Sequence, residues 1–233
     1  NEDVDILEQT KPNKNKWISF LADGILSGLM LGIGGMVSLS SENRFLGAFL
    51  FSLGLFCIVQ FKYGLFTGKV GYIVNRDLPY VAETAVPLVG NALGTLIAAL
   101  LLRQVRFFTS TVSTMDVTIS DRVQATVSGK IHDNPLSIFI LAVFCGILMF
   151  TAVEGSRKCK EEKNFAGSLF VVVMPVMVFI ICGFNHCIAD MFYFFAGCPE
   201  PSKAIVYFIL AIAGNSVGGM IVPLLKKLSN QPL

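Results

Sequence analysis

The chain has 233 residues, of which 54% are hydrophobic and only 15% are charged. A soluble domain carries roughly 25% charged residues, so this composition, with a mean hydropathy of +0.68, indicates a polytopic membrane protein with no room for a separate soluble enzyme domain. The net charge of +2 comes without a basic tract among interleaved aromatic residues, which excludes a nucleic-acid partner.

The hydropathy pattern predicts a charged tail over residues 1–16, a single transmembrane domain over 17–227 and a short tail over 228–233. Roughly 20 apolar residues span a bilayer as a helix. The membrane domain holds six such segments, which cover residues 18–39, 45–74, 81–102, 135–153, 165–197 and 203–225. Between them we expect a long polar connection over 106–134 and a solvated loop over 157–163.

Six crossings place both termini on the same side of the membrane. Lys and Arg are in excess in the tails and loops that share that side. Because positively charged loops stay in the cytoplasm, we expect a multi-pass protein of the inner (plasma) membrane with cytoplasmic termini.

The six cysteines form no C-x-x-C pair, and most lie in apolar stretches. Free cysteine in such positions packs as a small hydrophobic residue. We therefore expect buried free thiols and no disulfide framework. They are Cys57, Cys145, Cys159, Cys182, Cys187 and Cys198.

Two of the apolar segments are interrupted by polar residues. The second segment breaks over 60–69, a stretch that includes Thr67, and the fifth breaks near Gly183, where Asn185, His186 and Asp190 follow. Ionisable groups at membrane depth mark a pathway or a site. A broken helix is tolerated in a membrane only where its backbone is buried in protein or lines a cavity.

The two halves of the chain share a short motif. Segment three contains G-N-x-x-G at residues 90–94, and segment six contains it at 214–218. Each half has three segments, of which the middle one is broken. This arrangement predicts an inverted repeat with a binding site at the bilayer midplane, where the two breaks meet.

The breaks predict where an anion would bind. A helix that begins after a break presents free N–H groups and about half a positive charge, which favours a small anion. His186 follows the second break, and Thr67 lies in the first. The apolar side chains of Phe51, Leu55 and Phe179 flank the breaks and would form a narrow constriction that gates by dewetting.

Each of these residues also has a purely structural interpretation. His186 could be a satisfied packing residue, and Thr67 could cap the helix after the break. Phe51, Leu55 and Phe179 could be ordinary core residues. Asp190 could be a hydrogen-bond acceptor that stabilises its helix rather than a proton carrier.

The motifs resemble those of a known family. Leu65-Phe66-Thr67 in the first break, Gly183-Phe184-Asn185-His186-Cys187-Ile188-Ala189-Asp190 in the second, and the paired G-N-x-x-G motifs are similar to signatures of the formate/nitrite transporter family, which includes hydrosulfide channels. The second signature resembles the family's G-F-E-H-S-I-A-N-M. The resemblance covers the chain from Trp17 to Lys227.

This resemblance implies an all-α membrane protein with an aquaporin-like fold of six transmembrane helices, assembled as a homopentamer with a pore in each protomer. By this resemblance, Thr67 corresponds to the family's loop threonine and His186 to its central pore histidine. Lys130 corresponds to a lysine that attracts anions toward the vestibule. By the same resemblance, the apolar constriction comprises Phe51, Leu55 and Phe179.

Two positions depart from the family pattern. Asn185 replaces a glutamate beside the histidine, and Asp190 replaces an asparagine. Loss of the carboxylate should change the partner and the proton affinity of His186. The sequence from Thr67 to Lys69 and around Cys187 looks more like the hydrosulfide branch than the formate branch.

The combined interpretation is a channel, without enzyme activity, cofactor or metal, for hydrosulfide, formate or nitrite. The anion would be hydrogen-bonded near Thr67 and His186 and take up a proton there, because a neutral acid avoids the cost of a bare charge in a low dielectric. Three alternatives remain: an aquaporin-like channel for neutral solutes, a redox subunit with haem between His132 and His186, and a structural scaffold without flux.

Overall fold

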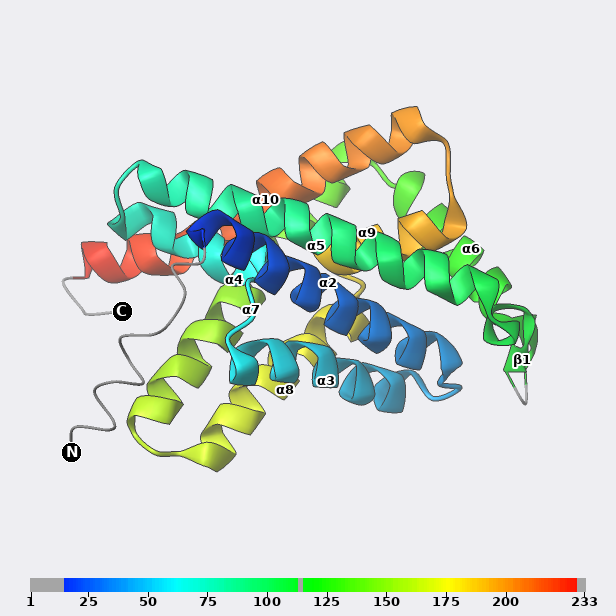
Figure 1. Cartoon of the computed structure of the whole chain (residues 1–233), viewed down its shortest axis with the longest axis horizontal. Coiled ribbons are helices and arrows are strands. Elements are labelled where there is room, and N and C mark those ends of the chain that lie inside the picture. The colour runs from blue at the N-terminus through cyan, green and yellow to red at the C-terminus, as the bar shows by residue number, and fades with distance from the viewer. Residues whose placement is uncertain (1–14, 113–114, 230–233) are drawn as a thin grey trace.

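The computed structural model describes residues 15–112 and 115–229, so the predicted N-terminal tail lies almost entirely outside the described residues. Within this part of the chain, six helices are long and apolar enough to cross a membrane, which confirms the six predicted segments (Figure 1). They are α2 (Lys16–Ser40), α3 (Arg44–Phe61), α5 (Pro79–Gln104), α7 (Pro135–Glu161), α8 (Phe165–Cys182) and α10 (Pro201–Leu228).

Both of the segments predicted to be interrupted consist of more than one helix. After α3 come the short helix α4 (Phe66–Lys69) and the 3-10 helix η1 (Val70–Asn75), and after α8 comes α9 (Cys187–Gly197). The long helices end at Lys62 and Gly183, which both adopt left-handed backbone conformations with φ of 60° and 70°. A positive φ stops a right-handed helix, and at Gly183 it carries no steric cost.

The first break is shorter than predicted. Only residues 62–65 separate α3 from α4, so Thr67 lies in the first turn of α4 and not in the loop. The helix can begin this early because the side chain of Asn91 accepts a hydrogen bond from the Phe66 N–H. The prediction of a ten-residue break was therefore too long at both ends.

The polar connection over 106–134 contains structure that the sequence pattern did not predict. It holds η2 (Arg106–Thr109), the antiparallel strands β1 (Thr111–Val112) and β2 (Met115–Thr118), and helix α6 (Ile119–Ile131). A capping box begins α6: the Asp121 N–H donates to Thr118 Oγ1 at 3.1 Å, and the Thr118 N–H donates to Asp121 Oδ2 at 2.8 Å. One face of α6 is buried, through Ile119, Val123 and Val127.

Helix α7 extends beyond its predicted end. Residues 157–161, expected to begin a solvated loop, form its last turns. Glu154 and Arg157 form a salt bridge of 2.5 Å, and Arg157 also pairs with Glu161 one turn further on. Such i,i+3 and i,i+4 pairs stabilise a helix that hydropathy alone would end at the membrane surface.

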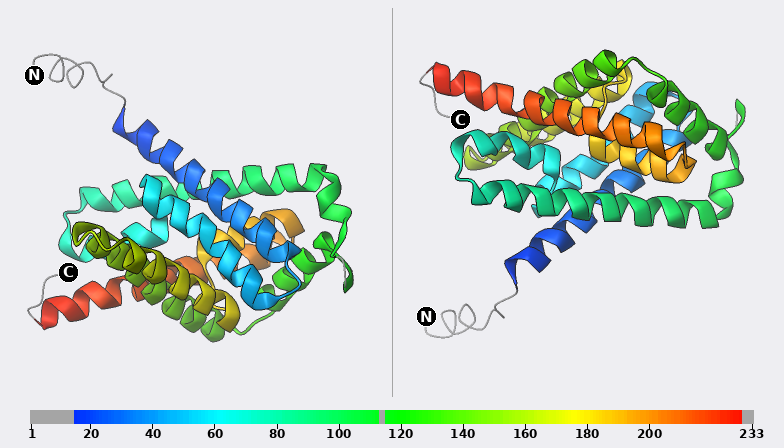
Figure 2. Two further views of the ribbon diagram at one scale, coloured as in Figure 1. Left: turned by 90° about the horizontal axis from the view of Figure 1, so that it is seen from below. Right: turned by 90° about the horizontal axis from the view of Figure 1, so that it is seen from above.

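The membrane helices pack as two similar groups, in which α2 lies against α5 and α10 against α7 (Figures 1 and 2). Glycines allow this close approach. A Cβ on Gly94 would lie 2.1 Å from the Ile25 carbonyl oxygen, and one on Gly218 would lie 2.0 Å from that of Val143. The second glycine of each G-N-x-x-G motif therefore makes equivalent contacts in the two halves.

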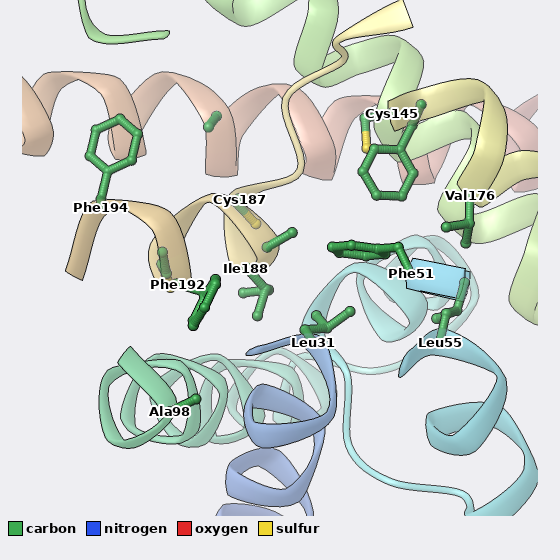
Figure 3. Close-up of a cluster of buried hydrophobic side chains, with 14 of the residues drawn as sticks. Leu31, Phe51, Leu55, Ala98, Cys145, Val176, Cys187, Ile188, Phe192 and Phe194 are labelled. Carbon is green, nitrogen blue, oxygen red and sulfur yellow. The ribbon is translucent and has the colours of Figure 1, made fainter. Parts of the chain in front are cut away.

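The buried core surrounds the point where α3, α8 and α9 meet (Figure 3). Leu31 of α2, Phe51 of α3 and Ile188 of α9 are each at most 2% exposed. Outward-facing side chains are also apolar: Leu53, Leu101 and Phe170 are each more than half exposed. Such surfaces fit a bilayer or neighbouring protomers rather than water.

The six cysteines are free, as predicted. The expectation that they are buried holds fully for Cys145 and Cys187, and the thiols at two other positions are half-buried. It is wrong for Cys182 and Cys198, which are exposed. Both of these residues lie at helix ends, one closing α8 and the other following α9.

Candidate functional site

The asparagine of the first G-N-x-x-G motif holds the first break in place. Asn91 is fully buried on α5. Its Oδ1 accepts from the Phe66 N–H at 3.0 Å, and its Nδ2 donates to the carbonyl oxygens of Gly64 at 2.8 Å and Gly24 at 2.9 Å. One side chain thus satisfies backbone groups that the interruption leaves without helical partners.

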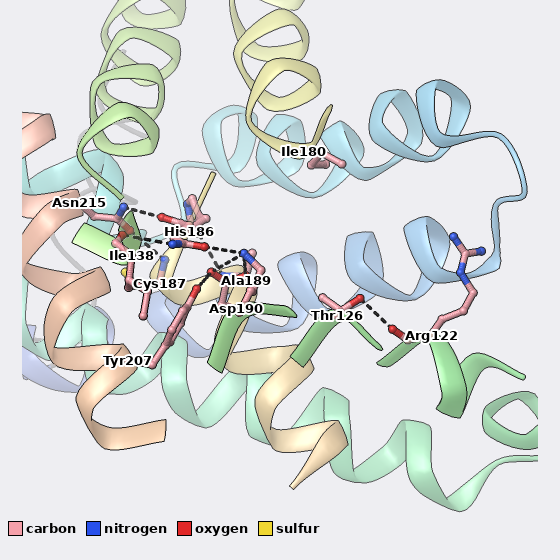
Figure 4. Close-up of polar contacts among 12 residues, drawn as sticks. Arg122, Thr126, Ile138, Ile180, His186, Cys187, Ala189, Asp190, Tyr207 and Asn215 are labelled. Carbon is pink, nitrogen blue, oxygen red and sulfur yellow. Dashed lines mark hydrogen bonds and ion pairs between the residues drawn. The ribbon is translucent and has the colours of Figure 1, made fainter. Parts of the chain in front are cut away.

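The asparagine of the second motif does the same for the second break (Figure 4). Asn215 Oδ1 accepts from the Cys187 N–H at 2.8 Å, and Nδ2 donates to the carbonyl oxygens of Asn185 and Ala142, each at 2.8 Å. The motif was recognised from the sequence, but this role was not, because it depends on contacts across 28 to 73 residues.

Thr67 and His186, predicted from separate halves of the chain, lie side by side. Thr67 Oγ1 is 3.1 Å from His186 Nε2, and both residues are at most 1% exposed. His186 is the N-cap of α9, where its Nδ1 accepts from the Ala189 N–H at 3.0 Å. The starts of α4 and α9 therefore meet at this pair.

These contacts determine the state of the imidazole ring. Because Nδ1 accepts a hydrogen bond from the backbone, a neutral His186 carries its proton on Nε2 and donates to Thr67 Oγ1. The Thr67 hydroxyl keeps its own proton to donate to a ligand. If Nδ1 were protonated, its N–H would face the Ala189 N–H and the hydrogen bond that caps α9 would be lost. The structure therefore favours the neutral ring.

The predicted constriction residues lie next to this pair. The rings of Phe51 and Phe179 meet edge to face with centroids 5.8 Å apart, and Phe179 stacks on His186 at 5.5 Å. Leu55 follows Phe51 by one turn of α3 and is 1% exposed. Figure 3 shows both side chains projecting from α3 beside Val176.

Lys130, in the last turn of α6, contacts both positions that depart from the family pattern. Its Nζ lies 2.8 Å from Asn185 Oδ1 and 3.1 Å from Asp190 Oδ1. Asp190 Oδ2 also accepts from the Tyr207 hydroxyl at 2.6 Å. Asn185 and Asp190 are therefore held by the same lysine, and neither is a partner of the His186 ring nitrogens, which contact Thr67 and Ala189. That the loss of the glutamate changes the partner of His186 stays a prediction.

A cavity of about 240 Å³ opens in front of the aromatic pair. Phe51 and Phe179 form part of its wall, and three cationic side chains also line it: Arg44, Arg122 and Lys130. The sequence pattern identified only the lysine. Arg44 lies far from it in the chain, and Arg122 lies two turns earlier on the same side of α6, but nothing in their local sequence marked them as part of a vestibule.

The described residues contain no group of three or more His, Cys, Asp or Glu side chains that could hold a metal ion. The two histidines have different surroundings. His132 ends α6 at the surface, where its Nδ1 lies 3.0 Å from the Ser128 carbonyl oxygen. His186 is buried and its two ring nitrogens contact Thr67 and Ala189, which leaves neither nitrogen open to a haem iron.

Comparisons with known proteins agree with this geometry. The model of the family described as "Formate/nitrite transporter" matches residues 5–227. Relatives include a formate channel FocA of Haemophilus influenzae, 26% identical over 82% of this chain and 71% of the relative, and a formate-nitrite transporter of Plasmodium falciparum, 24% identical over 88% and 75%. A solved pentameric formate channel with formate bound shares the fold, with a TM-score of 0.75 and 24% identity over 94% of this chain and 99% of that structure. The chain is therefore a member of the formate/nitrite transporter family, whose relatives here are channels and transporters.

Proposed function

We propose that this protein is a channel for small monovalent anions, with hydrosulfide preferred over formate and nitrite. The observation that carries the proposal is the buried Thr67–His186 pair, which lies where two helices begin and behind the aromatic pair of Phe51 and Phe179. The imidazole N–H donates to Thr67 Oγ1, so the Thr67 hydroxyl is the donor that this small site offers in apolar surroundings. Such a site suits a ligand of a few atoms that accepts hydrogen bonds.

The proposed path begins in the cavity lined by Lys130 and ends at His186. An anion that enters the cavity is attracted by the lysine and reaches the central pair, where it takes a proton from a transient His186 imidazolium. The ring then returns to its neutral form and regains a proton from bulk water. The protonated solute crosses the constriction as a neutral acid, because a bare charge there would cost several kcal/mol. Since the cap of α9 favours a neutral His186, an imidazolium would be a transient form and not the resting one.

The preference for hydrosulfide rests on the sequence around Thr67–Lys69 and Cys187, which resembles that branch of the family. The relatives named above are a formate channel and a formate-nitrite transporter, so formate and nitrite are the competing substrates. An aquaporin-like channel for neutral solutes is the second candidate, which the apolar constriction would also suit.

The proposed assembly is a homopentamer in the inner (plasma) membrane, with a pore in each protomer and cytoplasmic termini. The related solved channel is described as pentameric. The exposed apolar side chains of the membrane helices provide surfaces for such contacts. Mass measurement of the detergent-purified complex, with the bound detergent subtracted, would test the number of subunits.

The test of function is flux into proteoliposomes, compared for hydrosulfide, formate and nitrite across pH. Protein-free vesicles measure the leak of the neutral acids through lipid. Faster hydrosulfide uptake would support the proposed preference, whereas faster formate or nitrite uptake would overturn the preference and keep the anion channel. Water or glycerol flux without anion flux would replace the proposal by the neutral-solute channel.

A His186→Asn variant tests the proton step. Asparagine is a good N-cap residue, so α9 should retain its start, but the side chain cannot be protonated. We expect the pH dependence of flux to change, measured as initial rates over a pH series against wild type. An unchanged pH profile would remove His186 from the proton step.

A further inference from the structure

The long half-helices α3 and α8 end on opposite sides of the constriction formed by Phe51, Leu55 and Phe179. Arg44, which begins α3, contacts the end of α8. Lys160, in the last turn of α7 just before α8 begins, contacts the end of α3. The two helices are thus antiparallel, and each side of the constriction has the C-terminus of one of them. Such an end carries about half a negative charge, which would repel an entering anion.

At one mouth, Arg44 covers the end of α8. Its guanidinium donates to the carbonyl oxygen of Ile181 at 2.8 Å and to that of Ile180, labelled in Figure 4, at 3.3 Å. Arg44 also lines the cavity in front of Phe51 and Phe179. A full positive charge therefore replaces the partial negative charge of the helix end at the entrance to the constriction.

A second arginine of the same cavity acts in the same way. Arg122 donates to the carbonyl oxygens of Leu39 and Ser41, each at 2.7 Å, where α2 ends. Two helix C-termini therefore converge on this cavity, and an arginine covers each of them.

On the opposite side of the constriction, Lys160 covers the end of α3. Its Nζ donates to the Val59 carbonyl oxygen at 2.9 Å. Val59 lies one turn beyond Leu55, on the far side of the constriction from the cavity, and three residues before the left-handed Lys62. The equivalent ends of the two repeats thus carry equivalent cations, although their sequences differ.

The charge of these cations is available to an anion. In the described part of the chain, neither Arg44, Arg122 nor Lys160 forms an ion pair with a carboxylate. They donate to neutral carbonyl groups, whereas Lys130 is paired with Asp190 at 3.1 Å. The helix-capping residues therefore add positive charge to that of Lys130, whose charge Asp190 partly offsets.

We propose that Arg44 and Lys160 are the entry residues for anions at the two mouths, and that each acts by reversing the charge of a half-helix end. This inference rests on the proposed function as an anion channel. A charged mouth with apolar walls raises the local concentration of counter-ions, by about 10-fold or more in strong cases, and the effect weakens as salt screens it.

The test measures the initial flux of subsaturating formate in membrane vesicles of known orientation. Potassium gluconate, balanced by sucrose, raises the ionic strength on one side only. Wild-type flux should fall when salt is raised on either side. Arg44→Gln should lower flux several-fold at low salt and weaken the salt response on its own side alone, and Lys160→Gln should do so on the other side.

Matched variants separate charge from folding. Arg44→Lys retains the charge and should recover most of the flux. Arg103 donates to the Ala196 carbonyl oxygen at 3.2 Å near the end of α9 but is not among the described residues that line the cavity. Arg103→Gln should therefore leave flux and salt response unchanged. The inference would be overturned if the flux of Arg44→Gln responded to salt as the wild type does. It would also be overturned if Arg103→Gln lowered the flux as much as Arg44→Gln.

A second measurement does not depend on transport. Crystals soaked in bromide should show an anomalous peak within hydrogen-bonding distance of the Arg44 guanidinium, and crystals of Arg44→Gln should lack it. If the wild-type protein transports none of hydrosulfide, formate and nitrite but its crystals show this peak, the proposed function fails and the anion site at Arg44 stands. If the peak is absent from the wild type, the inference fails.

Discussion

Lys130 contacts both Asn185 and Asp190, which differ from the family pattern. An experiment can therefore test whether its carboxylate partner can lie at position 185 instead of position 190. The side chain of Asp190 is 4% exposed and that of Lys130 is 17% exposed. Removing one member of a buried ion pair typically costs 3–5 kcal/mol, because the other charge is left without compensation.

We predict that Asp190→Asn lowers the thermal stability of the protein, and that adding Asn185→Glu to this variant restores most of it. Asn185 Oδ1 already lies 2.8 Å from Lys130 Nζ, so a carboxylate at this position can form the pair. Unfolding followed by circular dichroism in detergent, for both single variants and the double variant, measures the coupling. Additive effects of the two changes would show that the carboxylates are not interchangeable.

At the scale of the element, α6 positions both Arg122 and Lys130, and its capping box responds to acid. The two hydrogen bonds from Thr118 hold the pKa of the exposed Asp121 carboxyl below its usual value. A pKa that is lower in the folded state stabilises the fold above the unfolded value of about 3.9. This stabilisation is lost as the pH falls through the lower folded value.

We therefore predict faster amide exchange at the start of α6 when the pH is lowered below about 4, after correction for the intrinsic rate at each pH. Asp121→Asn lacks the titrating group, so it should show a smaller change over the same range. Hydrogen exchange read by mass spectrometry on peptides from this region gives the measurement. An equal acid response in both proteins would exclude the capping box as the cause.

Hydropathy predicted the membrane helices because each one buries its backbone groups within its own segment. It did not predict α6, whose polar sequence is stabilised by the capping box and by packing of one face. The breaks were recognised from Gly183 and from the polar residues near Thr67, but their bounds depend on the distant Asn91 and Asn215. Arg44 and Lys160 were not predicted as site residues, because their partners are backbone carbonyls 136–137 and 101 residues away.

For the whole molecule, close contact between helices depends on glycines that are equivalent in the two halves. We predict that Gly218→Ala strongly destabilises the protein, because the added Cβ would lie 2.0 Å from the carbonyl oxygen of Val143. Gly129→Ala is the control: no atom lies within 4 Å of its Cβ position, and alanine favours a helix by about 1 kcal/mol. Thermal unfolding of the two variants should shift in opposite directions. Equal shifts would contradict tight packing at Gly218.

The asparagines at 91 and 215 have a consequence for how the family can diversify. Both hold the backbone of the breaks, so the path of the chain depends little on which side chains the loops carry. The residue at 185, for example, is held through its carbonyl oxygen by Asn215. A change of side chain there can alter what Lys130 contacts while the backbone of the break stays in place. Sequence variation in the two loops is therefore compatible with one fold.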